Sequence, residues 1–256
     1  MVPARFNLEV ICAVISAILV LMFRRIARAA ALAAALGLPA GCGSVAYDAL
    51  EPGEFSGSVL VLWVGENDGG FGDGKFIYVP VPGDELTLQR RNPNATVSII
   101  KPGAIYTDGG SIPRAAQVFK GFSPWGYAPA YMVHDWLFVA KKCVTDGAAT
   151  PDEVPIGRMD FIESAEILGE AIKGLIEAKR VKPNDVAPEM ISAAVAGPIS
   201  RSIWFQKGGC AKNRLSADHQ AKVDDYIARF GERVSEGTLE ETAVFNDTRA
   251  VALVRF

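Results

Sequence analysis

Two runs within residues 106–138 decide the fold: Tyr106-Thr-Asp-Gly-Gly-Ser-Ile-Pro-Arg114 and Tyr127-Ala-Pro-Ala-Tyr-Met-Val-His-Asp-Trp-Leu-Phe138. The first run contains a turn-forming sequence, from Asp108 to Ser111, after an apolar segment. The second run is apolar almost throughout, and its only charged residue is Asp135. A helix that is apolar on all sides is normally buried. A carboxylate beside an imidazole in such a helix needs hydrogen-bonding partners or a function. His134 and Asp135 are therefore the first candidates for a functional site.

The overall composition limits the classes of function. The chain has 256 residues, enough for one large domain or two small ones, and half of them are hydrophobic. With 26 basic and 29 acidic residues the net charge is -3, so the chain lacks the basic excess of a nucleic-acid-binding protein. The only histidines are His134 and His219, which limits the metal and catalytic schemes that the chain can support.

The N-terminus has the pattern of an export segment. Residues 6–23 are apolar and long enough for a transmembrane helix or a signal anchor. Three arginines follow, and then a second apolar run, residues 29–38, ends in Leu38-Pro-Ala-Gly-Cys42. A basic region, an apolar region and a small-residue site in this order are typical of a secretory signal. The last of these residues resemble a bacterial lipobox, in which the cysteine becomes lipidated after cleavage.

This segment leaves two interpretations open. In the first, translation starts at Met22, residues 1–21 are not part of the natural protein, and the mature chain begins at a lipidated Cys42. In the second, residues 6–23 are a transmembrane anchor. Both predict a bacterial envelope protein that is attached to the membrane and has an extracytoplasmic, periplasmic domain. Residues 1–42 are then signal or anchor, and residues 43–54 are a tether.

The cysteines fit an exported protein. Apart from Cys12 in the apolar segment and Cys42, the chain has Cys143 and Cys210, which either form a disulfide in an oxidising compartment or remain buried thiols. The chain has no CxxC pair and no cysteine–histidine spacing of the kind that binds structural zinc.

The remaining pattern predicts an α+β fold: a small antiparallel sheet followed by a helical half, preceded by the signal or anchor segment. Residues 55–205 are expected to form the main domain, and residues 206–256 a C-terminal helix and strand extension. Runs of β-branched and aromatic residues between turn signals predict strands, and a 3.6-residue period predicts helices. The expected strands are residues 58–64, 75–81, 85–90, 96–101 and 251–256, and the expected helices are 113–119, 126–142, 157–180, 188–205 (with a break at Gly197-Pro198) and 216–234.

The two motifs resemble domain-of-unknown-function family 1353, which occurs in bacteria and phages. The family is marked by a T-D-x-x-S-I/V-P loop and an H-D-W-L-Y/F helix. The residues of this chain that carry the resemblance are Thr107, Asp108, Ser111, Ile112, Pro113, Ala130, His134, Asp135, Trp136, Leu137 and Phe138. The resemblance covers residues 55–205 and implies that Glu166, or alternatively Asp160, matches an acid of the following helix. It implies a fold and a site, but no reaction.

A catalytic interpretation places Asp108, His134, Asp135 and Glu166 in one pocket. His134 would act as a base, and Asp108, Asp135 and Glu166 could hold a divalent cation. Ser111 and Trp136 would support them. Phospholipases A2 combine similar parts, a His-Asp pair on a helix beside a glycine-containing calcium loop, although their calcium-loop signature and disulfide scaffold are absent here. The chain would then be a membrane-attached hydrolase.

Other interpretations remain. A Ser-His-Asp hydrolase could use Ser111, but no Gly-x-Ser-x-Gly elbow supports it, and Ser111 suits a helix cap. HD phosphohydrolases need further histidines upstream of His134, and there are none. Finally, Asp108, His134 and Asp135 could form a structural hydrogen-bond network in a non-catalytic envelope or phage-related binding protein.

Overall fold

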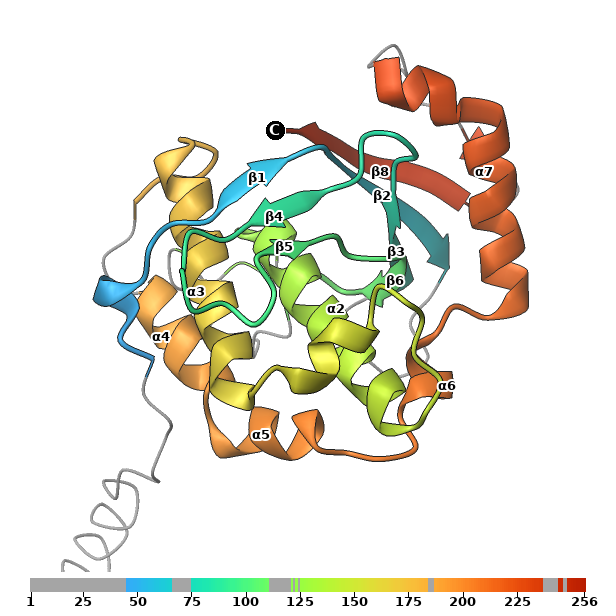
Figure 1. The fold of residues 1–256 in the computed structure, drawn as a ribbon. Coiled ribbons are helices and arrows are strands. Elements are labelled where there is room, and N and C mark those ends of the chain that lie inside the picture. The colour runs from blue at the N-terminus through green and yellow to red at the C-terminus, as the bar shows by residue number, and fades with distance from the viewer. Residues whose placement is uncertain are drawn as a thin grey trace, which may run out of the picture. The chain divides into compact units, whose positions relative to one another are not determined.

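The structure is a computed structural model that describes residues 45–65, 75–110, 121, 123, 125–183, 187–236, 244–245 and 248–256 (Figure 1). The export segment, Cys42, Ser111 and the expected helix over residues 113–119 lie outside these residues. The chain divides into two compact units, Met1–Gly41 and Cys42–Phe256, and only the second is described below. No helix in the described part of the chain has the length and apolarity to cross a membrane.

The larger sheet is antiparallel and has the strand order β6-β3-β2-β8-β7. Successive side chains of a strand point to opposite faces, so Val59 and Val61 of β2 join one core while Leu60 and Leu62 join another. Both faces of β2 are thus covered, which explains why its sequence is continuously apolar. The strands are β2 (Ser58–Gly65), β3 (Lys75–Pro80), β6 (Ile105–Thr107), β7 (Val244–Phe245) and β8 (Thr248–Arg255).

The smaller sheet consists of β1 (Glu54–Ser56), β4 (Thr87–Gln89) and β5 (Ile99–Ile100) in the order β1-β4-β5. The strands expected over residues 85–90 and 96–101 are present but shorter. One further backbone hydrogen bond, from Arg90 N to Ser98 O at 2.8 Å, continues the pairing beyond the strands. Regular pairing stops there because the turn at Asn92-Pro93 separates the two segments.

The helical half confirms the predicted α+β class. Asp160 caps α3 by accepting a hydrogen bond from Glu163 N at 2.7 Å, so this helix starts four residues later than expected. The break at Gly197-Pro198 is present, with Gly197 as the N-cap of a new helix. The helices are η1 (Tyr47–Ala49), α2 (Ala128–Thr145), η2 (Val154–Arg158), α3 (Phe161–Glu177), α4 (Ala187–Val195), α5 (Pro198–Trp204), α6 (Cys210–Asn213) and α7 (Ala217–Glu236).

Helices cover both faces of the five-stranded sheet. Helix α7 packs Val223 and Tyr226 against Leu60 and Leu62, and Figure 1 shows it lying along one side of β2 and β8. On the other face, α2 and α3 share the main core with Val59, Val61 and the smaller sheet. The segment 206–256, expected as an extension, supplies both α7 and a strand that pairs with β2.

A disulfide joins Cys143, near the end of α2, to Cys210, the first residue of α6. Of the two alternatives for these cysteines, the structure therefore contains the bonded one. Asp146, the C-cap of α2, strengthens the same junction, because its carboxylate accepts hydrogen bonds from Gly208 N and Cys210 N, both at 2.8 Å. These bonds favour the charged carboxylate and lower the pKa of Asp146.

Candidate functional site

Helix α2 carries the centre of the candidate site. The helix is buried on most sides, and His134 lies within it with only 7% of its surface exposed. The imidazole packs on Phe138, one turn further along, with 4.9 Å between ring centroids. Phe138 in turn packs edge-on against Trp204 of α5 at 5.0 Å. The aromatic stacking predicted from the helical spacing thus fixes the plane of the His134 ring.

Within the described part of the chain, the imidazole has no hydrogen bond of ordinary length. His134 Nδ1 lies 3.9 Å from Asp135 Oδ1, which is too long for a hydrogen bond. Among the described residues, His134 Nε2 and the hydroxyl of Tyr131 are buried without a hydrogen-bonding partner, as are the Tyr78 hydroxyl, Ser192 Oγ and Trp204 Nε1 elsewhere in the core. Nearly all buried polar atoms in folded proteins are paired, and on α2 two unpaired atoms lie one turn apart.

The loop after β6 lies against the same part of α2. The Thr107 hydroxyl accepts a hydrogen bond from Gly109 N at 3.0 Å, and Gly109 has a φ of 84°, where glycine is favoured. A side chain at Gly110 would place its Cβ 2.7 Å from the Tyr131 ring. Glycine is therefore required at the two positions for different reasons: Gly109 adopts a left-handed backbone conformation, and Gly110 lies too close to Tyr131 for a side chain.

Asp108 acts electrostatically on Asp135 across this contact. Burial raises the pKa of Asp135, and the Asp108 carboxylate raises it further, whereas His134 and the buried Lys142 oppose the rise. The Asp135 side chain is 40% exposed, so solvent screens part of this effect. Burial likewise lowers the pKa of Lys142, against the attraction of Asp135. Asp135 is thus the point at which the buried group meets solvent.

The structure brings together three of the predicted site residues: Asp108, His134 and Asp135. Trp136 is buried behind them, and its Nε1 would be 3.3 Å from a Cβ at Gly103, just before β6. Trp136 therefore packs against the backbone that leads into β6, and its predicted supporting role in the site stays a prediction. Ser111 lies outside the described residues, so its predicted role as support or cap stays a prediction.

Glu166 belongs to different surroundings. Burial is the main cause that raises the pKa of Glu166. The neighbouring Glu170, Asp160 and Glu163 raise it further, and Arg90 opposes the rise. Within the described residues, no group of three or more His, Cys, Asp or Glu side chains has the geometry to hold a metal ion. The proposed set of Asp108, Asp135 and Glu166 is therefore not assembled, and binding of a divalent cation stays a prediction.

Two acids of α3 lie in the core. Glutamates are usually on the solvent side of a helix, but Glu163 and Glu170 are both buried. The side chain of Arg90 is 0% exposed and donates Nε to Glu170 Oε2 at 2.6 Å and Nη1 to Glu163 Oε1. Thr96 donates to Glu163 as well. Both can be buried because the partner that neutralises these acids comes from another part of the chain.

The other histidine, His219, lies on α7. It is half-buried, and its Nδ1 lies 2.7 Å from the hydroxyl of Tyr106. Tyr106 also accepts a hydrogen bond from Ser216 N at 3.0 Å, so the strand before Asp108 is tied to the start of α7.

Two members of the site escaped the sequence reasoning as polar participants, Tyr131 and Lys142. Tyr131 was assigned to stacking and Lys142 to the end of the helix. Both lie on the same face of α2 as Asp135, four residues before it and seven residues after it. The negative charge of Asp135 acts to raise the pKa of each of them. Their helical spacing from Asp135 was the signal that could have identified them.

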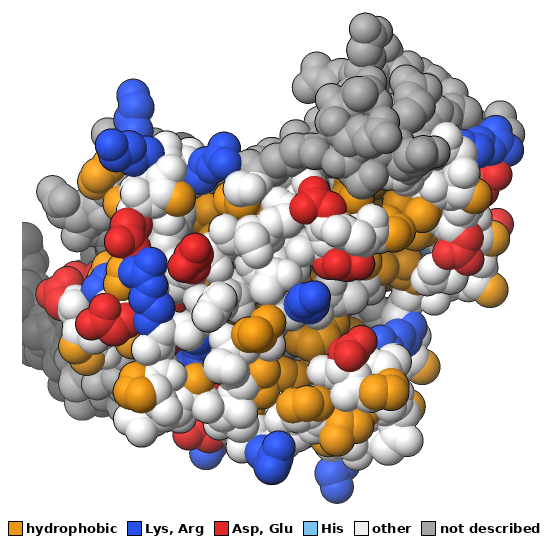
Figure 2. All heavy atoms as spheres, turned by 45° about the horizontal axis from the view of Figure 1, so that its top comes forward, with side chains coloured by type: hydrophobic (Ala, Val, Ile, Leu, Met, Phe, Trp, Pro, Cys, Tyr) orange, Lys and Arg blue, Asp and Glu red, His pale blue; other side chains and the backbone are white. Residues whose placement is uncertain are grey.

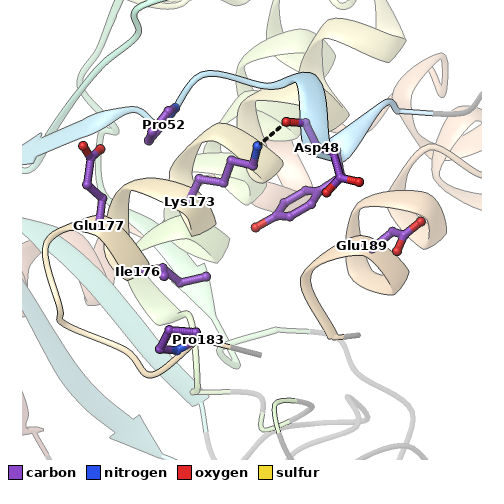
Figure 3. A pocket seen from close by; sticks show the side chains of 8 residues that line it. Asp48, Pro52, Lys173, Ile176, Glu177, Pro183 and Glu189 are labelled. Carbon is purple, nitrogen blue, oxygen red and sulfur yellow. Dashed lines mark hydrogen bonds between the residues drawn. The ribbon is translucent and has the colours of Figure 1, made fainter. Parts of the chain in front are cut away.

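Two pockets lined by described residues lie elsewhere. One, of about 470 Å³, lies between η1, α3 and α4 and is lined by Tyr47, Asp48, Pro52, Lys173, Ile176, Glu177, Pro183 and Glu189 (Figure 3). The other, of about 580 Å³, is mainly apolar and is lined by Val61, Phe76, Trp125, Gly126, Ala128, Pro129, Leu175, Arg180, Val181 and Phe256. Neither includes His134 or Asp135.

On the face drawn in Figure 2, basic and acidic side chains are interspersed, and neither sign collects into one large patch. This agrees with the small net charge of -3. The absence of a nucleic-acid partner stays a prediction from composition.

In comparisons with known proteins, the chain matches no protein-family model, no curated protein and no solved structure. The resemblance to family 1353 therefore depends on the two sequence motifs alone.

Proposed function

We propose that the protein is a membrane-attached hydrolase of the bacterial envelope in which His134 is the general base. One observation carries the proposal: His134 Nε2 is buried and unpaired, beside a carboxylate that reaches solvent. A structural histidine would be expected to satisfy both ring nitrogens. A base must instead keep one nitrogen ready to accept a proton from its substrate or from water.

The chemistry follows from the position of the Asp135 carboxylate beside the His134 ring. The Asp135 carboxylate, 3.9 Å from Nδ1, favours the tautomer with the proton on that nitrogen and leaves Nε2 as the acceptor. His134 then takes a proton from water as the water oxygen attacks an ester or amide carbonyl. The same proton passes to the leaving oxygen or nitrogen, which gives a carboxylic acid and an alcohol or amine. Lys142 lies near the negative charge of Asp135 and limits its electrostatic cost.

The envelope location is supported by the export segment and by the Cys143–Cys210 disulfide, since disulfides persist in oxidising compartments. In this proposal the membrane is reached through a lipid on Cys42 or through residues 6–23. Family 1353 is the family we propose for the chain, on the motifs that carry Asp108 and His134. An envelope enzyme in this position would encounter lipid, ester and peptidoglycan substrates.

The test compares His134→Asn with His219→Asn, because His219 is the only other histidine. Hydrolysis of lipid, ester and peptidoglycan substrates is measured for both variants and the wild type, with and without added divalent cations. The proposal predicts that His134→Asn loses at least about 100-fold in rate, the typical contribution of a general base, while His219→Asn keeps its activity. A folded His134→Asn variant with full activity would refute a catalytic His134.

A second function is favoured by one observation, the close packing of Gly110 on Tyr131. In that function the motif loop and α2 brace each other in a non-catalytic envelope or phage-related binding protein. It predicts no hydrolysis of any of these substrates, together with a lower melting temperature for His134→Asn. An unchanged melting temperature would count against it.

A further inference from the structure

Helices α4 and α5, with the C-cap of α5, expose large apolar side chains, which are normally buried in a folded protein. Met190 is 55% exposed, Ile199 78%, Ile203 40% and Phe205 54%. We call these four residues the α4–α5 face. Ile199 and Ile203 are one helical turn apart and therefore lie on the same side of α5. Isolated exposed apolar residues are common, but four within sixteen positions indicate an interaction surface.

The charges within the segment from Ile191 to Lys207 are basic, whereas the acid Glu189 precedes Met190 at the start of α4. Between Met190 and Gln206 the chain contains no acidic residue, and Arg201 is its only charge. The guanidinium of Arg201 lies over the ring of Phe205, 5.2 Å from its centroid. Lys207 follows directly. Apolar side chains with basic residues among them match the boundary between lipid tails and anionic headgroups.

The chain enters the described domain beside α4. Tyr47 and Asp48 of η1 line the same pocket as Glu189 of α4, and Figure 3 shows Lys173 reaching from α3 toward Asp48. Lys173 Nζ donates to the backbone oxygens of Asp48 at 2.9 Å and Leu50 at 2.8 Å, which holds this entry segment in place. Cys42 is five residues before Tyr47. A lipid on Cys42 would therefore hold the entry segment within about 18 Å of the bilayer, since an extended chain spans at most ~3.6 Å per residue.

We infer that the α4–α5 face rests on the surface of an anionic bilayer, with Ile199, Ile203 and Phe205 inserted among the headgroups and Arg201 paired with phosphate. The inference rests on the membrane attachment in the proposed function and adds a second point of contact. The lipid on Cys42 or the segment 6–23 would tether the chain, and the α4–α5 face would fix which side of the domain faces the membrane.

The test uses the full chain in vesicles of phosphatidylethanolamine and phosphatidylglycerol, with photoreactive benzoylphenylalanine at position 199, 203 or 99. Ile99 is the matched control, because it is also an exposed isoleucine, at 51%, but lies in β5. Flotation first measures attachment, and irradiation then measures crosslinking to lipid. The inference predicts at least fivefold more lipid adduct at positions 199 and 203 than at position 99.

The outcomes separate the inference from the proposed attachment. A chain that floats with the vesicles but crosslinks equally at all three positions overturns the inference and leaves attachment intact. A chain that does not float overturns both. Crosslinks from positions 199 and 203 to a second copy of the chain, in place of lipid, also overturn the inference and identify a self-association surface.

A second variant tests the role of charge. Arg201→Glu should reduce lipid adducts at position 199 at least threefold in the anionic vesicles, and should make no difference in vesicles of phosphatidylcholine alone. An equal yield from Arg201→Glu and the parent in anionic vesicles would remove the electrostatic part of the inference.

Discussion

At the scale of single residues, two sets of buried polar atoms in the core contrast with each other. Arg90, Glu163 and Glu170 satisfy one another by charge-assisted hydrogen bonds. His134 Nε2 and the Tyr131 hydroxyl are satisfied by no group. The Arg90 cluster should stabilise the fold, whereas the unpaired atoms of His134 and Tyr131 should destabilise it. Mutations in the two sets should therefore change the free energy of unfolding in opposite directions.

Replacing Arg90 by methionine should therefore be severely destabilising. It leaves two buried carboxylates without a counter-charge, and breaking a buried ion pair in this way costs about 3–5 kcal/mol. The free energy of unfolding from urea denaturation measures the loss. Arg91→Met is the matched control: its ion pairs with Glu54 and Glu177 are exposed, so it should cost less than about 1 kcal/mol. Equal losses for the two variants would contradict a structural role of the Arg90 cluster.

Replacing His134 by leucine should have the opposite effect on stability. The variant removes an unpaired buried nitrogen, so the free energy of unfolding should stay unchanged or rise by about 1 kcal/mol. Activity, in the proposed function, should be lost. Thr107→Val is the control, because it deletes a buried hydroxyl that does accept a hydrogen bond and should cost about 1 kcal/mol. A large destabilisation in His134→Leu would show that the imidazole is structural.

At the scale of helices and strands, the junction of α2 with α6 makes stability depend on pH. The pKa of Asp146 is lowered by its hydrogen bonds from Cys210 N and Gly208 N. A lowered pKa in the folded state means that this stabilisation is complete above the unfolded-state value of about 3.9 and is lost as the pH falls through the folded-state pKa. Asp146→Ala should therefore unfold at lower urea than the wild type at neutral pH, and the difference should disappear in strong acid.

The control for this prediction is Asp152→Ala, which removes another exposed aspartate from the segment between α2 and α3. It should change the urea midpoint less than Asp146→Ala at neutral pH. A difference between Asp146→Ala and the wild type that persists unchanged in strong acid would mean that the charged carboxylate is not the cause.

The elements also show which features the sequence could predict. The apolar runs of β2, β3 and α2 were predictable because each is covered on both sides, and the caps Ser216 and Asp160 stand at or near the expected starts. The buried Glu163 and Glu170 were not predictable, because Arg90 lies 73 and 80 residues away and no local pattern announces the pairing. For the site, the two motifs predicted that Asp108 lies near Asp135. The place of Lys142 was not predictable, because its side chain packs against the start of α6, at Gly209.

At the scale of the whole molecule, β8 is the strand on which the larger sheet depends. It pairs with β2 over six residue pairs, from Ser58 with Arg255 to Trp63 with Arg249. Deleting residues 248–256 would leave one edge of β2 unpaired beneath α7. We expect the truncated chain to lose its cooperative thermal transition and to aggregate. Phe256→Ala, which removes only the ring stacked on Phe55 at 5.2 Å, should keep a cooperative transition at a lower melting temperature. A truncated chain that still unfolds cooperatively would contradict the central role of β8.

The pairing of β2 with β8 also determines when the larger sheet can form during folding. These two strands are separated by most of the domain's sequence, so the larger sheet can close only when residues 248–256 are available to pair with β2. A ribosome or a translocation channel that still holds residues 248–256 keeps the domain open. In the proposed export of the chain, this order of strands would delay folding until residues 248–256 have crossed the membrane.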